Sequence, residues 1–471
     1  MCDNVVMFTK IKSIIIATVL IIPLLIAPLS ASAATSVAIT SPSSGSTATG
    51  TSFTVTGTAT AKRAITVKVN GTTVGTTTSD NSGNWSLNVT GQSAGAKTIE
   101  ATASVSYAYV PNTADATISV INTVTNEKIG SNIGSGVNQT SVAIKPDGTQ
   151  MVTVSGFGIG NTIKVWSLAN PEVPVVTHTL TASGGIALGG YYTPDGQYFY
   201  VTSEEGDFSA GYVRRYLSAD PTTSAAVTGF DQNFPAYVSF KSDSSRAYVG
   251  NVVSSTMSVI NVSTNTQIST FAGGGSGGGG PLMSDNIHGY SLSGGTDSAR
   301  PYNVDAGTFG SAIAVGSGPR VGILNQAQNN YIVSNYSSDT LSVIDTSSNT
   351  VVSSPSTGAG SNPFGLAFSN DFSQLYVVEN ALDRVSVRNP STYAVASNIT
   401  VGDSPATITL GPTESATTSV SFTLAAATSA ASLADTGDNP NLALLISITL
   451  ILSSMTGVYA LRRHNNKSKL S

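Results

Sequence analysis

Cysteine is nearly absent from this chain of 471 residues, and its one cysteine, Cys2, precedes the first apolar run. If that run is removed on export, the mature chain can form neither a disulfide nor a cysteine-ligated metal site. Histidine is almost as scarce, because only His178 and His288 lie in the part expected outside the cell. We therefore expect no zinc site, no other metal site and no cofactor.

Charge is also scarce. Asp, Glu, Lys and Arg make up 10% of the chain, against about 25% in an average soluble protein. Thr, Ser, Asn and Gly take their place, which is typical of secreted β-proteins. The formal net charge is −5 and no basic stripe is visible, so we expect no nucleic-acid partner.

A unit of about 44 residues is repeated through the middle of the chain. Its clearest copy, 329–371, contains four short runs rich in Val, Ile, Tyr and Thr, separated by turn residues. Each copy therefore predicts one four-stranded sheet. Such a sheet cannot bury its own faces and needs similar sheets stacked on it. The run Leu-Ser-Val-Ile-Asp recurs in full or in part at 118–122, 163–167, 257–261, 341–345 and 385–389, and more weakly at 212–216 and 302–305.

These runs resemble the YVTN-type β-propeller repeat, in which Tyr-Val-Thr-Asn, Ser-Val-Ile-Asp and Thr-Val-Val strands precede a Pro-Asp-Gly turn. The resemblance implies an all-β fold with a seven-bladed propeller over 105–413. Its last expected strand, Ala406–Leu410, would complete the blade that begins on a second strand at Tyr107. Closing the ring in this way would remove two free sheet edges.

Residues 1–33 predict a secretory signal peptide. Its three parts are the basic Lys10 and Lys12, the apolar run 14–29, and the small residues Ala31 and Ala33 before cleavage at Ala34. The alternative, a retained N-terminal membrane helix, is disfavoured by two prolines inside the apolar run.

Residues 34–104 show alternating apolar and polar residues without the propeller repeat. The Asn70-Gly71 dipeptide between two such runs predicts a tight hairpin, since both residues tolerate positive φ. The length suits a small β-sandwich, and the segment resembles a bacterial immunoglobulin (Ig)-like module. Such a module can be a rigid spacer or a binding unit, and we favour the spacer.

The C-terminal end has the parts of a surface anchor. A Ser/Thr/Ala-rich segment, 414–432, is expected to form a stalk. An apolar run, 442–461, predicts a transmembrane helix and a basic tail, 462–471, predicts a cytoplasmic end. Between them lie Leu433, Ala434, Asp435, Thr436 and Gly437.

These five residues resemble an LPxTG-type cell-wall sorting signal of Gram-positive bacteria, with Ala434 in place of proline. The resemblance implies a transient sortase partner and covalent attachment to peptidoglycan at the cell surface. A plain membrane anchor is the alternative.

Few side chains are grouped in a way that suits catalysis. The exception is a carboxylate cluster, Glu204, Glu205 and Asp207, in one loop of the third unit. It could bind calcium or supply an acid/base pair, but its spacing matches no calcium loop and a solvated loop is the simpler interpretation. We expect no catalytic residue.

The candidate ligand face is the end of the propeller where loops enter the innermost strands and join the second and third strands. It would carry Arg320, Tyr336 and Phe364 together with the 204–207 loop. The simpler alternative is that Phe364 packs inward and Arg320 is merely solvated. The leading hypothesis is a non-catalytic, wall-attached surface protein that binds an extracellular protein or glycan. A propeller hydrolase or lyase and a purely structural envelope protein are the alternatives.

Overall fold

The computed structural model describes residues 34–427, except 157–159, 208–209, 232, 273–276 and 279. Within this part the expected all-β class is confirmed, and the one helical element is the short 3-10 helix η1 (Asn380–Leu382). No helix in it is long and apolar enough to cross a bilayer. The expected signal peptide, sorting signal and membrane helix lie outside the described residues.

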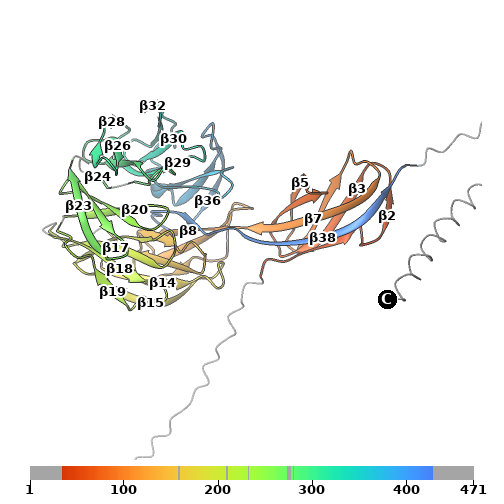
Figure 1. The fold of residues 1–471 in the computed structure, drawn as a ribbon, viewed down its shortest axis with the longest axis horizontal. Helices are drawn as coiled ribbons and strands as arrows, with labels where there is room; N and C mark the ends of the chain where they lie inside the picture. Colours follow the sequence, from red (N-terminus) through yellow and green to blue (C-terminus); the bar gives the residue numbers. More distant parts are fainter. Residues whose placement is uncertain are drawn as a thin grey trace, which may run out of the picture.

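Seven antiparallel sheets follow one another between Tyr107 and Leu410 in the described part of the chain (Figure 1). Sheets 2 to 7 are formed by consecutive strands, whereas sheet 1 takes one strand from the C-terminal end. From the innermost to the outermost strand, the sheets are: sheet 1, β37 (Thr409–Leu410), β8 (Tyr107–Asn112), β9 (Thr117–Asn122) and β10 (Glu127–Lys128); sheet 2, β12 (Ser141–Ile144), β13 (Gln150–Val154), β14 (Thr162–Ser167) and β15 (Val175–Thr181); sheet 3, β16 (Ile186–Tyr192), β17 (Tyr198–Glu204), β18 (Gly211–Leu217) and β19 (Ser224–Ala226); sheet 4, β20 (Pro235–Phe240), β21 (Arg246–Asn251), β22 (Thr256–Asn261) and β23 (Thr266–Ala272); sheet 5, β24 (Gly277–Gly278), β25 (His288–Ser293), β26 (Ser298–Asn303) and β27 (Thr308–Phe309); sheet 6, β29 (Pro319–Leu324), β30 (Asn330–Asn335), β31 (Thr340–Asp345) and β32 (Thr350–Ser353); sheet 7, β33 (Pro363–Phe368), β34 (Leu375–Glu379), β35 (Arg384–Arg388) and β36 (Val395–Thr400). Two short strands, β11 (Ile133–Gly134) and β28 (Ile313–Ala314), add to the third strands of sheets 1 and 5.

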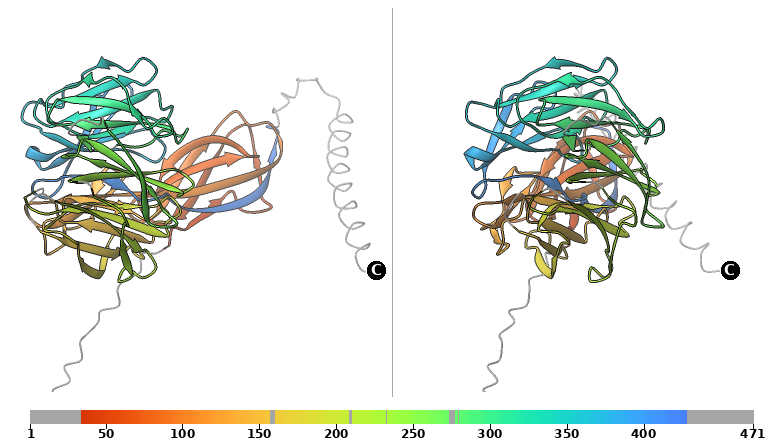
Figure 2. Two further views of the ribbon diagram at one scale, coloured as in Figure 1. Left: turned by 60° about the vertical axis from the view of Figure 1, so that its left-hand side comes forward. Right: turned by 90° about the vertical axis from the view of Figure 1, so that its left-hand side faces the viewer.

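The core of the array lies between neighbouring sheets. Each sheet buries apolar side chains against the next one along the chain, for example Val152 and Val154 of sheet 2 against Phe199 and Val201 of sheet 3. Sheet 7 in turn packs against sheet 1, where the residues in contact include Ala108, Val110, Tyr376 and Val378. Figure 2 shows the array from two further sides.

The turns between first and second strands need one residue of positive φ. Gly148 and Gly196 supply it in the two Pro-Asp-Gly turns, as the sequence predicts. Ser244, Asn286 and Gln328 adopt the same left-handed conformation in the equivalent turns, at a cost of about 1 kcal/mol each. The turn geometry is therefore the same in the sheets whose turn has no glycine.

Within the glycine-rich run 273–280, Gly277 and Gly278 form strand β24, paired with Ser293 and Leu292 of β25. Because glycine has no side chain, only the backbone of this strand takes part in sheet 5.

The N-terminal residues form a β-sandwich of two sheets, ordered β1-β3-β6 and β2-β38-β7-β4-β5. Its strands are β1 (Val37–Ser41), β2 (Thr47–Thr49), β3 (Phe53–Ala59), β4 (Ala64–Val69), β5 (Thr72–Thr78), β6 (Asn84–Val89), β7 (Gly95–Val105) and β38 (Glu414–Ala425). The predicted Asn70-Gly71 turn joins β4 to β5, and both residues have positive φ.

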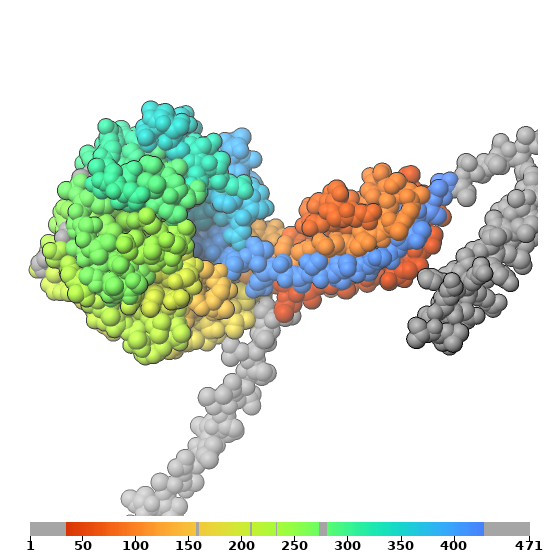
Figure 3. Space-filling view, viewed as in Figure 1, coloured from red at the N-terminus to blue at the C-terminus, as the bar shows by residue number. Residues whose placement is uncertain are grey.

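The prediction of a stalk over 414–432 is wrong for residues 414–425, which the structure describes as a strand. Residues 414–425 are strand β38, which pairs with β7 over eleven residue pairs and with β2 in parallel. Phe422 and Leu424 are buried in the sandwich core because alternate side chains of a strand face the same side. The last strand of the sandwich thus comes from residues that follow the array in the chain. The array is inserted between β7 and β38 of the sandwich. Figure 3 shows β38 running along the sandwich.

Candidate functional site

The pairing registers divide the loops of the array between two faces. Pro319 pairs with Asn335 and Ile186 with Glu204, so innermost strands begin where second strands end. We call this end the distal face. The opposite end carries the turns between first and second strands, and also the start of β8 and the end of β37, where the sandwich is attached; we call it the junction face. The candidate ligand face is therefore directed away from the sandwich.

Three of the expected residues contact one another on the distal face. The guanidinium carbon of Arg320 lies 5.0 Å from the ring centre of Tyr336 and 5.7 Å from that of Phe364. The two rings meet edge to face at 6.0 Å, and the Tyr336 hydroxyl donates a 3.2 Å hydrogen bond to Asn380 Oδ1. Arg320 is exposed, whereas both rings are half-buried. We call these three residues the distal cluster.

Two β-bulges explain how Arg320 and Phe364 reach the face, whereas Tyr336 directly follows β30. The pairing of β29 with β30 slips between Pro319 and Gly322, and that of β33 with β34 slips between Pro363 and Leu366. A bulge re-aims the side chains within it. The residue that follows each proline, Arg320 in one case and Phe364 in the other, lies in the bulge.

Electrostatically, the distal cluster presents a cation on an aromatic platform. Within the described residues no carboxylate forms an ion pair with Arg320. Its contacts with the two rings stabilise its orientation by about 0.5–1 kcal/mol. The guanidinium is therefore held in place while its hydrogen-bond donors stay available to an acidic or hydroxyl-rich ligand.

Aspartates with positive φ hold the distal loops of sheets 5 to 7. Asp297, Asp339 and Asp383 each stand just before a third strand. Each accepts backbone N–H groups from the loop that enters the next sheet along the chain. Sequence reasoning missed these contacts, although Asp339 stands in the clearest copy of the repeat. The loops beside the distal cluster are consequently fixed to their neighbours.

The pKa of Asp339 reflects this role. Burial raises it, but hydrogen bonds from the N–H groups of Asn362 (2.8 Å) and Gly360 (2.7 Å) outweigh burial and leave the pKa below its usual value. The carboxylate is therefore the form that the folded protein favours.

The carboxylate loop lies on the same face but in sheet 3, whereas the distal cluster belongs to sheets 6 and 7. Glu204 is buried at the end of β17 and Asp207 is exposed. Glu205 accepts a 2.5 Å hydrogen bond from the hydroxyl of Tyr212, which raises the pKa of Tyr212. In the part of the chain that the structure covers, no group of three or more His, Cys, Asp or Glu side chains could hold a metal ion.

Sheet 7 replaces a recurring polar contact by an ion pair that sequence reasoning also missed. In sheets 1 and 4, an asparagine at the end of the second strand donates to a threonine and a serine of the third, as Asn112 does to Thr117 and Ser119. In sheet 6 the oxygen of Asn335 accepts from the hydroxyls of Thr340 and Ser342 at the same place. Sheet 7 has Glu379 at this position, fully buried, with Arg384 Nε at 2.5 Å and Arg388 Nη2 at 2.9 Å. The charged residues at these repeat positions were a visible signal.

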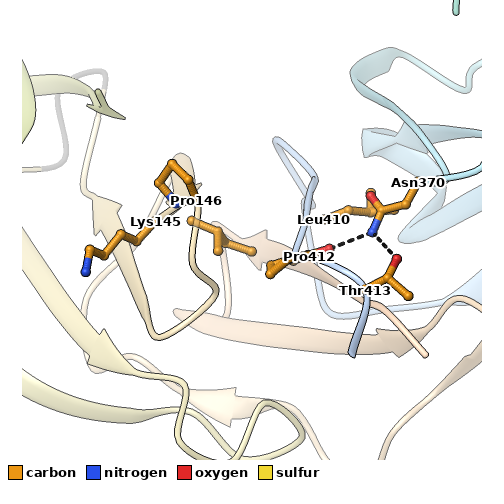
Figure 4. Close-up of a pocket in the computed structure, with 8 residues that line it drawn as sticks. Lys145, Pro146, Asn370, Leu410, Pro412 and Thr413 are labelled. Carbon is orange, nitrogen blue, oxygen red and sulfur yellow. Dashed lines mark hydrogen bonds between the residues drawn. The ribbon is translucent and has the colours of Figure 1, made fainter. Parts of the chain in front are cut away.

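A pocket of about 420 Å³ opens on the junction face (Figure 4). Lys145 and Pro146 of the first turn of sheet 2 form one side, and Asn370 forms another. Asn370 Nδ2 donates to the Gly411 carbonyl at 2.9 Å and to Thr413 Oγ1 at 3.0 Å. The side-chain amide of Asn370 thus holds residues 411–413 where the chain leaves the array.

The sandwich also docks on the array through side chains. Arg63 is almost fully buried, lies 5.8 Å from the ring centre of Tyr107 and pairs with Glu172 at 3.6 Å. Burial raises the pKa of Tyr107, whose hydroxyl donates to Glu172 at 2.8 Å. Lys62 adds an exposed ion pair with Glu127 at 2.7 Å.

Comparison with known proteins assigns one part of the chain. Residues 36–101 match the bacterial Ig domain family. The expected Ig-like module is thereby confirmed, and strand β38 lies beyond the matched residues. No curated protein matches the sequence.

The array resembles solved structures of β-propeller-like proteins. A candidate 6-phosphogluconolactonase from Bacteroides fragilis is 12% identical, with a TM-score of 0.54 over 65% of this chain and 98% of its own. A protein from Lactobacillus plantarum is 14% identical, with a TM-score of 0.54 over 65% and 100%. A functionally unknown protein from Desulfotomaculum acetoxidans is 14% identical, with a TM-score of 0.52 over 65% and 98%. Identities this low show the fold alone and assign no activity.

Proposed function

We propose that this is a non-catalytic cell-surface protein whose distal face binds an extracellular protein or glycan. The seven sheets would form a closed seven-bladed β-propeller of the YVTN-type, with β37 as the strand that closes the ring. The observation that carries the proposal is the distal cluster: an exposed arginine, held on two aromatic rings, on the face opposite the sandwich. Arginine and tyrosine are, with tryptophan, the residue types enriched among those that dominate binding energy at protein interfaces.

The position of β38 supports a wall-attached orientation. Glu414 pairs with Val105 beside the array, so Ala425 lies at the remote end of the sandwich. A strand of twelve residues is about 40 Å long. The chain would leave the sandwich toward a sorting signal at Leu433–Gly437, where a sortase would transfer Thr436 to peptidoglycan. The distal face would then point away from the wall.

Anchoring is tested by Thr436→Ala. This change should move the protein from the fraction released by muramidase to the membrane fraction, because the acyl transfer would have no acceptable site. An unchanged distribution would remove the sortase from the proposal.

Binding is tested with residues 34–427 on a glycan array and on cells. Arg320→Ala should reduce binding at least tenfold, Arg320→Lys should recover only part because lysine lacks the planar fork, and Tyr336→Phe should have a small effect. Arg246→Ala, in a second strand near the junction face, is the matched control and should bind normally. Binding that survives Arg320→Ala combined with Tyr336→Ala would overturn this site.

The hydrolase or lyase alternative makes a different prediction. It requires turnover of the bound ligand and loss of that turnover in Glu205→Gln. Unaltered ligand after prolonged incubation would exclude it.

A further inference from the structure

The strands that join the two domains form one nearly continuous ribbon. Leu410 pairs with Ala108 in the array, and Glu414 pairs with Val105 in the sandwich. Three residues, 411–413, face two, 106–107, so a single extra residue separates the two ladders, and Gly411 N–H donates to the Tyr107 carbonyl between them at 2.8 Å. The pairing of β8 with β37 therefore continues directly into that of β7 with β38.

The part of this ribbon inside the array is short. Strand β37 makes two residue pairs with β8, against six between β16 and β17 and five between β20 and β21 among the described strands. An isolated bridge from Asn112 to Pro405 adds to it. Among the described innermost strands only β24 makes as few pairs, and two pairs by themselves hold a strand weakly. The eleven pairs of β7 with β38 lie immediately beyond.

We propose that the Ig-like sandwich is a clamp that keeps the propeller ring shut. This inference rests on the closed ring proposed above. Because β38 is hydrogen-bonded to β7 along its length, the end of β37 is held next to β8. The effective concentration of β37 beside β8 therefore stays high. Docking of Lys62 and Arg63 on sheets 1 and 2 keeps the clamp aligned. Opening would separate sheet 7 from sheet 1 and expose the side chains buried between them.

The clamp is tested by cutting its connection to β37 without damaging either domain. The parent is the full chain with Cys2→Ser and with Ser104→Cys and Ser415→Cys, a directly paired couple, oxidised to hold β38 in the sandwich. A specific protease site is inserted between Pro412 and Thr413. After cleavage, amide hydrogen exchange in β37 and in β34, which faces sheet 1, should rise at least tenfold, and the melting temperature should fall.

A second cleavage site, inserted between Ser347 and Ser348 in an exposed turn of sheet 6, is the matched control. Cutting there should leave exchange in β37 unchanged. Equal exchange in β37 before and after cleavage at 412–413 would overturn the clamp.

Closure itself is tested separately. Ala108→Cys with Leu410→Cys, in a chain carrying Cys2→Ser but otherwise unaltered, should form a disulfide if β37 lies beside β8 in solution. Failure of this disulfide would refute the closed ring. If the disulfide forms but cleavage at 412–413 does not raise exchange in β37, the ring is closed and only the clamp is refuted.

Discussion

At the scale of residues, repeat positions carry different chemistry in different sheets. Asn335 satisfies its sheet with neutral hydrogen bonds, whereas Glu379 at the matching place needs two arginines. Arg388 donates also to Ser386 Oγ and to the carbonyls of Ser356, Thr357 and Tyr393. Through the carbonyls of Ser356 and Thr357, Arg388 thus ties sheet 7 to the loop that leaves sheet 6.

Removing one partner of this pair should be costly. We expect Glu379→Asn to lower the free energy of unfolding by about 3 kcal/mol, because Arg388 would remain buried and charged. Adding Arg384→Thr and Arg388→Ile copies the chemistry of sheet 6 and should recover at least half of the loss in urea denaturation. A triple variant as unstable as the single one would mean that the carbonyl contacts of Arg388 dominate.

Asp339 should make stability depend on acid pH. Asp339→Asn keeps the left-handed backbone, which both residues tolerate, and should cost about 1 kcal/mol at pH 7. Since the folded pKa lies below the unfolded value, the wild-type advantage is present above about pH 4. It should be lost as the pH falls through the folded pKa.

Thermal denaturation of the wild type and the Asp339→Asn variant between pH 7 and pH 2.5 measures this convergence. Asp305→Asn, which loses an exposed ion pair with Lys241, is the control and should change stability by less than about 0.5 kcal/mol. A difference between the wild type and Asp339→Asn that is independent of pH would contradict the charged interaction.

At the scale of elements, the sequence predicts strands well where the repeat makes them self-similar. The sheet of the clearest copy, 329–371, was visible because Val, Ile and Tyr recur at fixed spacing. Strand β38 was missed because Ser, Thr and Ala dominate it and its partner β7 is more than 300 residues away. Val420, Phe422 and Leu424 do alternate with polar residues, which is the period of a strand.

The same contrast holds for the candidate site. Arg320 and Phe364 could be placed on one face because each follows a proline that starts an innermost strand. Their contact with Tyr336 could not be predicted, since it depends on bulges and on the packing of sheet 7 against sheet 6. The carboxylate loop was grouped with them by topology alone and lies in a distant sheet.

Strand β38 offers a direct test of the discontinuous sandwich. Phe422→Ala removes a ring that is buried and lies 4.8 Å from Phe53. We expect a loss of about 3–4 kcal/mol, as for other buried phenylalanines, measured by thermal or urea denaturation of residues 34–427. Thr423→Ala, on the exposed side of the same strand, should have little effect. An unchanged stability in Phe422→Ala would be expected of a stalk and not of a core strand.

At the scale of the whole molecule, orientation depends on the junction between sandwich and array. Two covalent crossings, at 105–107 and 411–413, lie side by side. Arg63 opposes rotation about them because it joins the sandwich to Tyr107 of sheet 1 and to Glu172 beyond β14. The distal face is then kept pointing away from the sandwich, on the side of the array opposite to the one where β38 begins.

Arg63→Ala should therefore loosen the molecule more than it destabilises it. We expect broader small-angle scattering distance distributions and faster exchange near Lys62, since Glu172 and the Tyr107 ring would lose their partner. The cost in unfolding free energy should stay at about 1–3 kcal/mol, because the pair is long at 3.6 Å and Glu172 keeps its hydrogen bond from Tyr107. Lys68→Ala, which breaks an exposed pair with Glu100 on the same sandwich, is the control and should leave the scattering unchanged. If Arg63→Ala scatters as the parent does, the ribbon alone sets the orientation of the distal face.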